Sequence, residues 1–284
     1  MVSFRLRQVG ALFGGRAILA NRPMVRVRRR AKSNASSEPM KKLFEINPAI
    51  DRQACASRFA ERTRVQIRDV LTRETAEEIR MILARGTRWG LAVRAGDGTA
   101  NPPRSFYPHE VATPAGAEEA NKAALAAHQA SARGDYAFRY ANYPILDALN
   151  QKWDPDGPYE LLLEYLNAAD FLDLVREVTG FLDLIKADAQ ATFYAPNHYL
   201  GRHNDSHVAE GWRVAYVLNF APDDWHPDWG GYLMFLDSDG DVIEGFRPRF
   251  NALNLFAVPQ AHLVSYVPPF APMGRFALTG WLRT

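Results

Sequence analysis

The sequence predicts an α+β fold that is mainly β: a double-stranded β-helix, the cupin-like jelly roll, supported by N-terminal helices. One observation is a change of pattern near residue 183. Before it, apolar residues recur at helical spacing; after it, short apolar runs alternate with Pro, Gly, Asn and Asp. The other is the order, helices first and strands afterwards, which packs one all-β core against helices. We expect residues 41–182 to be a mainly helical support region and residues 183–284 the β core, together one globular unit.

The N-terminal half predicts one strand and three helices. Residues 64–71 alternate in polarity and predict a strand. Residues 74–85 form a helix in which Thr72 is the N-cap, Thr75 and Glu78 form a capping box, and Gly86 is the stop. Two further helices are expected at residues 117–133 and 158–179.

Six short apolar runs predict the strands of the core. They cover residues 189–194, 214–220, 232–236, 252–258, 262–267 and 276–282. The segment from Asp237 to Asp241 predicts a hairpin tip. It is also similar to part of a calcium loop, but the twelfth position, where an acidic ligand is required, is Pro248. We therefore reject a calcium site.

Charge is concentrated at the N-terminus. Residues 1–42 hold eleven Arg or Lys and one acid, Glu38, a net charge of 11 − 1 = +10; since the whole chain is +2, residues 43–284 sum to −8. The leader, residues 1–40, has two interpretations: a disordered basic arm or transit peptide, or sequence outside the native protein, with translation starting at Met24 or Met40. The acidic remainder argues against nucleic acid as a partner.

Composition limits the remaining classes. Cys55 is the single cysteine, so no internal disulfide can form. No run of eighteen apolar residues occurs, which argues against a transmembrane helix and a membrane partner. We expect a cytoplasmic location, or an organellar one if the leader is a transit peptide. The sequence leaves the oligomeric state unknown.

The chemistry is carried by His203, Asp205 and His262. The two residues of an H-x-D pair point to one face of a strand and can reach one ion together, and His262 can approach from a neighbouring strand. Two imidazoles and one carboxylate form the facial triad of non-heme Fe(II) oxygenases. His207 follows closely and is interpreted first as a solvated loop residue, second as a substrate contact. His226 is interpreted as structural.

Arg275 lies thirteen positions after His262. An arginine fork matches a carboxylate bidentately, and the alternation of a strand places Arg275, Ala277 and Thr279 on one face. This predicts a socket for an organic acid near the metal. The alternative is a surface arginine beside a C-terminal strand.

Together these segments resemble the catalytic domain of the Fe(II)/2-oxoglutarate-dependent dioxygenases, and more narrowly the prolyl 4-hydroxylase superfamily. The matching pieces are Gly201-Arg202-His203-Asn204-Asp205, residues 213–219, Trp229-Gly230-Gly231-Tyr232-Leu233, His262 and residues 275–281. The resemblance implies that His203, Asp205 and His262 bind Fe(II). It also implies that Arg275 binds the 5-carboxylate of 2-oxoglutarate, with Tyr194 and Thr279 in the same pocket. Tyr216 competes with Tyr194 for that place.

By the same resemblance the cofactors are Fe(II), 2-oxoglutarate as co-substrate, O2 and, as an additional reductant, ascorbate. The expected reaction is hydroxylation of an unactivated C–H bond with release of succinate and CO2, first of a prolyl residue in a peptide or protein. The alternatives are a free amino acid or other small metabolite and, more distantly, a non-catalytic metal-binding jelly roll.

Substrate residues are expected in two places. The aromatic stretch from Tyr136 to Tyr143 is interpreted first as sheet packing and second as the edge of a substrate cleft, with Arg139 and Tyr140 as the contacts. The segment from Ala221 to Trp229 is interpreted as a lid or as a hydrophobic corner, with Trp225 as its candidate contact.

Overall fold

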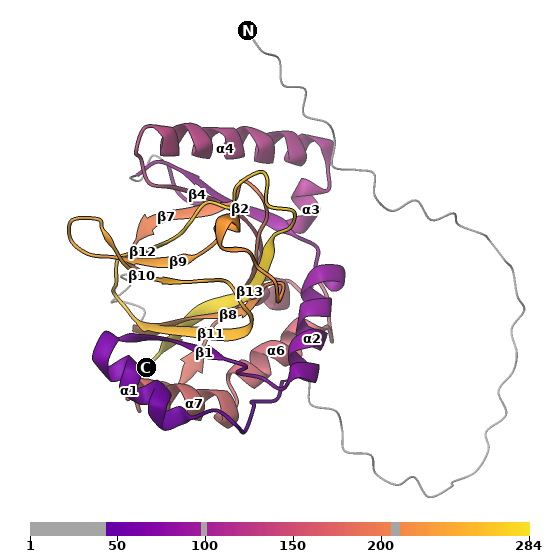
Figure 1. The fold of residues 1–284 in the computed structure, drawn as a ribbon. Coiled ribbons are helices and arrows are strands. Elements are labelled where there is room, and N and C mark those ends of the chain that lie inside the picture. Colours follow the sequence, from indigo (N-terminus) through magenta and orange to yellow (C-terminus); the bar gives the residue numbers. More distant parts are fainter. Residues whose placement is uncertain (1–43, 98–100, 206–210) are drawn as a thin grey trace, which may run out of the picture. The chain divides into compact units, whose positions relative to one another are not determined.

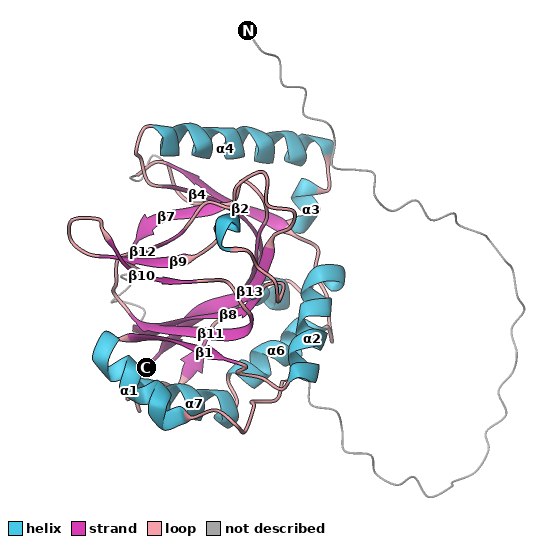
Figure 2. Ribbon diagram, viewed as in Figure 1, coloured by secondary structure: helices cyan, strands magenta, loops and turns pink. Residues whose placement is uncertain are grey.

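Thirteen strands of the described chain form one antiparallel sheet that curls into a nearly closed barrel (Figures 1 and 2). The structure is a computed structural model and describes residues 44–97, 101–205 and 211–284. The leader and His207 lie outside the described residues. The strands are β1 Arg64–Arg68, β2 Gly90–Ala95, β3 Arg104–Phe106, β4 Ala137–Tyr143, β5 Lys186–Ala187, β6 Gln190–Tyr194, β7 Tyr199–His203, β8 Trp212–Phe220, β9 Leu233–Leu236, β10 Val242–Phe246, β11 Phe250–Ala257, β12 His262–Val264 and β13 Arg275–Arg283.

The strand order is that of a double-stranded β-helix, as the sequence predicted. The main path runs β1-β11-β8-β13-β6-β4-β7-β12-β9-β10, so strands distant in sequence lie side by side. Strand β4 joins the two halves, because it pairs with β6 and with β7. All six predicted core strands are present. Strands β5 and β10 are additional, and β7 is the strand on which His203 was expected to lie.

Helices cover the sheet on two sides. Helix α4 lies across β2 and β4, and the other long helices gather near β1, β8 and β11 (Figure 1). Apolar side chains of α1, α2, α6 and α7 share one core with β1, β8, β11 and β13. The helices are α1 Arg52–Arg62, α2 Arg73–Met81 continued by the π-helix Ile82–Gly86, α3 Pro108–Val111, α4 Pro114–Ala132, α5 Ile145–Asn150, α6 Pro158–Leu166, α7 Ala169–Thr179 and the 3-10 turn Pro227–Trp229. No described helix has the length and hydropathy needed to cross a membrane.

The N-terminal region differs from the expected helical support, because it also supplies strands β1 to β4.

Two predictions about helices were wrong in detail. The helix expected at 158–179 is two helices: the Asn167 side chain bonds the backbone of Leu163 and, in both directions, of Ala187 on β5, which ends α6. The expected capping box is not formed, because Thr75 lies inside α2 and accepts a hydrogen bond from the Thr72 hydroxyl.

The hairpin between β9 and β10 was predicted correctly. The Asp237 carboxylate accepts hydrogen bonds from the backbone N–H groups of Asp239 (3.0 Å) and Asp241 (2.9 Å). Gly240 takes a positive φ of 93°, which glycine adopts without strain. The aspartate side chain therefore builds the turn itself.

Candidate metal centre and carboxylate pocket

The two histidines face each other across one strand pair. Strands β7 and β12 run antiparallel, with His203 opposite His262, and the two ring centroids are 4.0 Å apart. Phe256 packs edge-on against His262 at 4.7 Å. The strand pairing thus brings together two imidazoles separated by nearly sixty residues of sequence.

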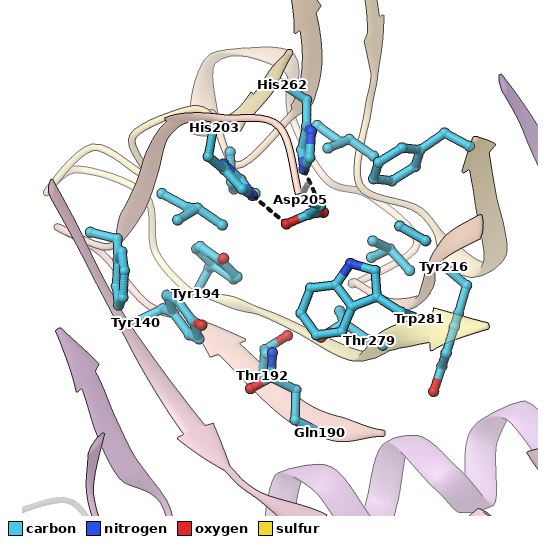
Figure 3. Close-up of a pocket in the computed structure, with 18 of the residues that line it drawn as sticks. Tyr140, Gln190, Thr192, Tyr194, His203, Asp205, Tyr216, His262, Thr279 and Trp281 are labelled. Atoms are coloured by element: carbon cyan, nitrogen blue, oxygen red, sulfur yellow. Dashed lines mark ion pairs between the residues drawn. The ribbon is translucent and has the colours of Figure 1, made fainter. Parts of the chain in front are cut away.

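Asp205 reaches the histidines by a route that strand alternation does not describe. Strand β7 ends at His203, and Asp205 has a positive φ of 52°. This left-handed backbone, which Asp tolerates better than most residues, directs the carboxylate between the imidazoles. Its Oδ1 lies 3.4 Å from His203 Nε2 and its Oδ2 lies 3.4 Å from His262 Nε2 (Figure 3).

Each imidazole is oriented by a backbone carbonyl. His203 Nδ1 is 2.9 Å from the oxygen of Gly201, and His262 Nδ1 is 2.8 Å from the oxygen of Gln260. A carbonyl can only accept, so both Nδ1 atoms carry a proton, and both Nε2 atoms face the Asp205 carboxylate, where they can bind a metal once they have lost their own protons. One ligand atom from each of the three residues lies within 4.8 Å of the others. This nitrogen-and-oxygen set fits a divalent transition metal.

The carboxylate is kept ionised despite its environment. Burial alone would raise the pKa of Asp205, but hydrogen bonds and charges from His203 and His262 outweigh it and hold the pKa well below the usual value. The ionised carboxylate is the form that binds a cation, and the cation then replaces the protons on the two facing Nε2 atoms.

Arg275 is a buried cation beside this centre. It opens β13, is 2% exposed, and its guanidinium stacks on the Tyr194 ring at 4.4 Å. Its Nη1 donates a long hydrogen bond of 3.4 Å to Asn219 Oδ1, and its Nε is buried without a hydrogen-bond partner in the described chain. Burial lowers the pKa of Arg275 to about 10. A buried guanidinium with unused donors fits an anionic ligand.

The expected neighbours of Arg275 lie beside it. Tyr194 is its partner in the β6–β13 register, and both Tyr194 and Thr279 line the same cavity as the triad. Tyr216 also lines this cavity, but its hydroxyl donates to the Asp188 carbonyl at 2.7 Å and points away from the triad (Figure 3). Tyr194 is therefore the tyrosine that faces Arg275.

The cavity that joins these groups has a volume of about 320 Å³. The triad and Arg275 both line it, and aromatic rings form much of the remaining lining. Among the described lining residues, Asp205 is the single carboxylate. The polar groups Gln190 and Thr192, which sequence reasoning missed, lie opposite the triad (Figure 3).

The aromatic stretch from Tyr136 to Tyr143 lines the cavity with some of its rings and packs in the core with others. Tyr136, Phe138 and Tyr140 alternate along the strand and line the cavity, and Tyr140 stacks on Tyr194 at 5.2 Å. Tyr143 packs instead on Tyr159 in the core. The period of two in this stretch was the signal for cavity-lining residues.

Two of the expected substrate residues lie elsewhere. Arg139 is adjacent to Tyr140 on the strand and so points to the opposite face, near Tyr199 and Tyr266. Trp225 is 1% exposed and its indole N–H donates to the Gly230 carbonyl at 3.0 Å. Neither residue lines the cavity, so the segment around Trp225 is a hydrophobic corner.

Comparison with known proteins agrees with this site. Residues 189–283 match the sequence model of the 2OG-Fe(II) oxygenase superfamily. A search of curated proteins gave no match. Among solved structures, the chain is similar to a prolyl hydroxylase from Trichoplax adhaerens in complex with a hypoxia inducible factor oxygen degradation domain peptide. The identity is 16% and the TM-score 0.52, with 82% of this chain and 88% of the other covered.

Two bacterial structures are also similar. A prolyl-4-hydroxylase from Pseudomonas putida is 29% identical over 46% of this chain and 68% of its own, with a TM-score of 0.38. An oxidoreductase of the 2OG-Fe(II) oxygenase family from Burkholderia pseudomallei is 13% identical over 84% of this chain and 93% of its own, with a TM-score of 0.49.

The described chain has a jelly-roll fold, shared with a solved prolyl hydroxylase. Over residues 189–283, which contain the His203, Asp205 and His262 triad, the sequence matches the 2OG-Fe(II) oxygenase superfamily, a class of dioxygenases. The cofactors that this family implies are Fe(II), 2-oxoglutarate and O2, as the resemblance indicated.

Proposed function

We propose that the enzyme hydroxylates a prolyl residue within a peptide or protein. The observation that carries this proposal is the lining of the cavity around the triad. It is rich in aromatic rings, and Asp205 is its single carboxylate among the described residues. Because a free amino acid carries an ammonium charge that a carboxylate would balance, and the single lining carboxylate is the candidate metal ligand Asp205, this lining favours a substrate whose nitrogen is already acylated.

In this proposal His203, Asp205 and His262 hold Fe(II), which supplies oxygen activation when bound together with 2-oxoglutarate. Asp205 contributes a negative charge that offsets part of the charge of the ion, and the Gly201 and Gln260 carbonyls fix both imidazole rings. The aromatic wall of β4 excludes water from the reacting C–H bond.

Arg275 holds the distal carboxylate of 2-oxoglutarate, with Tyr194 and Thr279 as neighbours in the pocket. The support is the unpartnered Nε, the long bond to Asn219, and a depth of burial at which a guanidinium gains most from a carboxylate. A bidentate contact also orients the co-substrate toward the triad.

A peptide substrate has one further support. The Trichoplax prolyl hydroxylase, which shares this fold, was solved with a peptide bound. The second candidate, a free amino acid or small metabolite, is favoured by the modest volume of the cavity, about 320 Å³.

The test is succinate release from 2-oxoglutarate with a panel of proline-containing peptides and a matched panel of free amino acids. We expect turnover with one or more peptides, and a product heavier by one oxygen by mass spectrometry. Turnover with free amino acids alone would overturn the peptide assignment. A His262→Ala variant, purified in the same way, measures the succinate that forms without a complete metal site.

A further inference from the structure

A second groove lies on the barrel, away from the catalytic cavity. It has a volume of about 830 Å³ and is lined by α1, β1, β10 and the β10–β11 connection. Among the described strands, β1 and β10 end the main strand path and pair there on one side only, so the groove runs between two open sheet edges. None of its lining residues lines the cavity that contains the triad.

Strand β1 gives this groove a basic face. Val65 and Ile67 are buried in the core beneath the helices, so the alternating Arg64, Gln66 and Arg68 point the other way. The lining holds six arginines against three acids. The arginines are Arg58, Arg62, Arg64, Arg68, Arg247 and Arg249, and the acids are Asp51, Glu61 and Glu244.

Gln66 fixes the β10–β11 connection against β1. Its amide nitrogen donates to the Arg247 carbonyl at 3.1 Å, and its amide oxygen accepts from Arg249 Nε at 2.9 Å. The arginines of this connection are therefore held beside Arg68 rather than free to spread into solvent.

Only part of this charge is neutralised. Arg62 and Arg64 share Glu244, at 3.3 and 2.6 Å. Within the described chain, the other four arginines form no ion pair: Arg58, Arg68, Arg247 and Arg249.

These unpaired arginines crowd one another. Burial, followed by the positive charges of Arg68 and Arg247, lowers the pKa of Arg249. The Nε of Arg247 is buried and has no hydrogen-bond partner among the described residues. Like charges held together without a counter-charge indicate a place for an anionic ligand.

We propose that this groove docks an extended, carboxylate-rich segment of a protein partner. Two open strand edges offer backbone donors and acceptors to an extended chain, and the four arginines offer charge. A single-stranded nucleic acid would also need aromatic rings for its bases, and Phe246 is the single aromatic ring among the described residues of the lining. The leader of this chain, at +10 for residues 1–42, is repelled by the groove.

The experiment measures fluorescence anisotropy of a labelled glutamate-rich peptide on the full-length protein. We expect binding that weakens as salt is added and that is absent for a lysine-rich peptide of equal length. The variant Arg58→Glu with Arg68→Glu should weaken binding on the order of tenfold or more. Both side chains are exposed and form no ion pair in the described chain, so the variant should fold. Arg58→Gln with Arg68→Gln tests the same point without reversing charge.

The matched control is Arg85→Glu with Arg88→Glu, which changes the net charge equally at exposed sites that lie outside the groove and form no ion pair in the described chain. It should leave peptide binding unchanged. Equal losses in both variants would show that net charge alone attracts the peptide. Absence of glutamate-peptide binding, or tighter binding of a single-stranded oligonucleotide, would each overturn the proposal. Because no groove residue lines the catalytic cavity, succinate release is measured separately and reports on the proposed reaction alone.

Discussion

His262 and Gln260 are joined by a hydrogen bond that sets the direction of a candidate metal ligand. The Nδ1–H of His262 donates to the Gln260 carbonyl at 2.8 Å. The Gln260 side chain in turn donates to the carbonyls of Ala257 (2.7 Å) and Thr63 (3.1 Å), and it accepts from Arg64 Nη1 at 3.1 Å. The amide side chain therefore locks the turn that holds the carbonyl in place.

Replacing the Gln260 side chain should weaken Fe(II) binding without unfolding the protein. In Gln260→Ala the carbonyl remains but its turn loses three hydrogen bonds, and we expect Fe(II) affinity to fall roughly tenfold, the lower part of the range for partners of metal-bound histidines. Anaerobic Fe(II) titration with 2-oxoglutarate measures this, with Gln129→Ala on α4 as the control. An unchanged affinity would mean that the carbonyl needs no help from its side chain.

Removal of the candidate ligand itself should have a larger effect. His262→Ala deletes one of the three ligands, so we expect the weak visible charge-transfer band of the Fe(II)–2-oxoglutarate complex to disappear and succinate release to fall more than about a hundredfold. His226→Ala removes an exposed histidine outside the cavity and should retain both signals. A band of normal intensity in His262→Ala would exclude this residue as a ligand.

Arg275 should show opposite effects on stability and on co-substrate binding. Arg275→Met removes a buried charge that has no carboxylate partner in the described chain, so the variant without ligand should gain thermal stability. It should also lose the rise in Tm that 2-oxoglutarate gives the parent protein. Arg275→Lys keeps the charge but not the fork, and should weaken 2-oxoglutarate by about 1.5–3 kcal/mol, or roughly 10- to 100-fold.

Arg283→Lys, at the far end of the same strand, is the matched control and should change neither property. If Arg275→Met is destabilised and still gains the full rise in Tm with 2-oxoglutarate, then Arg275 serves the core and not the co-substrate.

The sequence was sufficient to predict strands whose residues alternate in polarity or are uniformly apolar. Burial of one face of a strand leaves the alternating pattern, and burial of both faces leaves the apolar one. It was also sufficient for Arg275 and Thr279, which share a face by simple alternation. Strand β7 was expected only from the H-x-D pair and not from its own pattern, because its residues are mostly half-buried and lack an apolar alternation. Strand β10, with its exposed Val242 and Ile243, gives no sign of which face is covered.

The position of Asp205 was expected correctly for an incomplete reason. Alternation along a strand would place it beside His203, yet the strand ends at His203 and a positive φ at Asp205 makes the contact. Single-residue backbone conformations of this kind leave little trace in sequence. Arg139 and Trp225, which were expected to contact the substrate, do not line the cavity. The period of two separates Arg139 from the cavity-lining face, whereas the burial of Trp225 leaves no pattern in its neighbours.

Acid stability should report on His198, a histidine outside the candidate metal site. Burial, followed by the charge of Arg139, lowers the pKa of His198 to about 4 and outweighs the hydrogen bond to Phe193. The neutral ring is therefore favoured in the folded state. The contribution of the neutral ring to the free energy of unfolding is therefore fully present above pH 6.5, the pKa of histidine in the unfolded chain. It is lost as the pH falls through about 4, and the total loss is up to about 3 kcal/mol.

In His198→Leu this part of the acid sensitivity should vanish, although the Ala195 N–H loses its acceptor. Urea unfolding at neutral and acidic pH measures the difference, and His128→Leu on the exposed face of α4 should keep the full pH dependence of the parent. A parallel pH dependence in His198→Leu and parent would assign the acid sensitivity to other groups.

Substitutions of the neighbouring residues Tyr140 and Arg139 should have different effects on kcat/KM. Tyr140 lines the cavity and stacks on Tyr194, whereas Arg139 points to the other face of β4. Loss of an aromatic stack costs about 0.5–1.5 kcal/mol, so Tyr140→Ala should lower kcat/KM roughly three- to tenfold. The affinity for 2-oxoglutarate should fall in parallel, because the Tyr194 ring loses the ring that stacks on it. Tyr140→Phe keeps the ring and should restore most of the activity.

Arg139→Ala should leave kcat/KM unchanged for a small peptide. Steady-state succinate assays on all three variants show which of the two residues contributes to catalysis. If Arg139→Ala is the impaired variant and Tyr140→Ala is not, the substrate lies on the opposite face of β4 from the cavity proposed here.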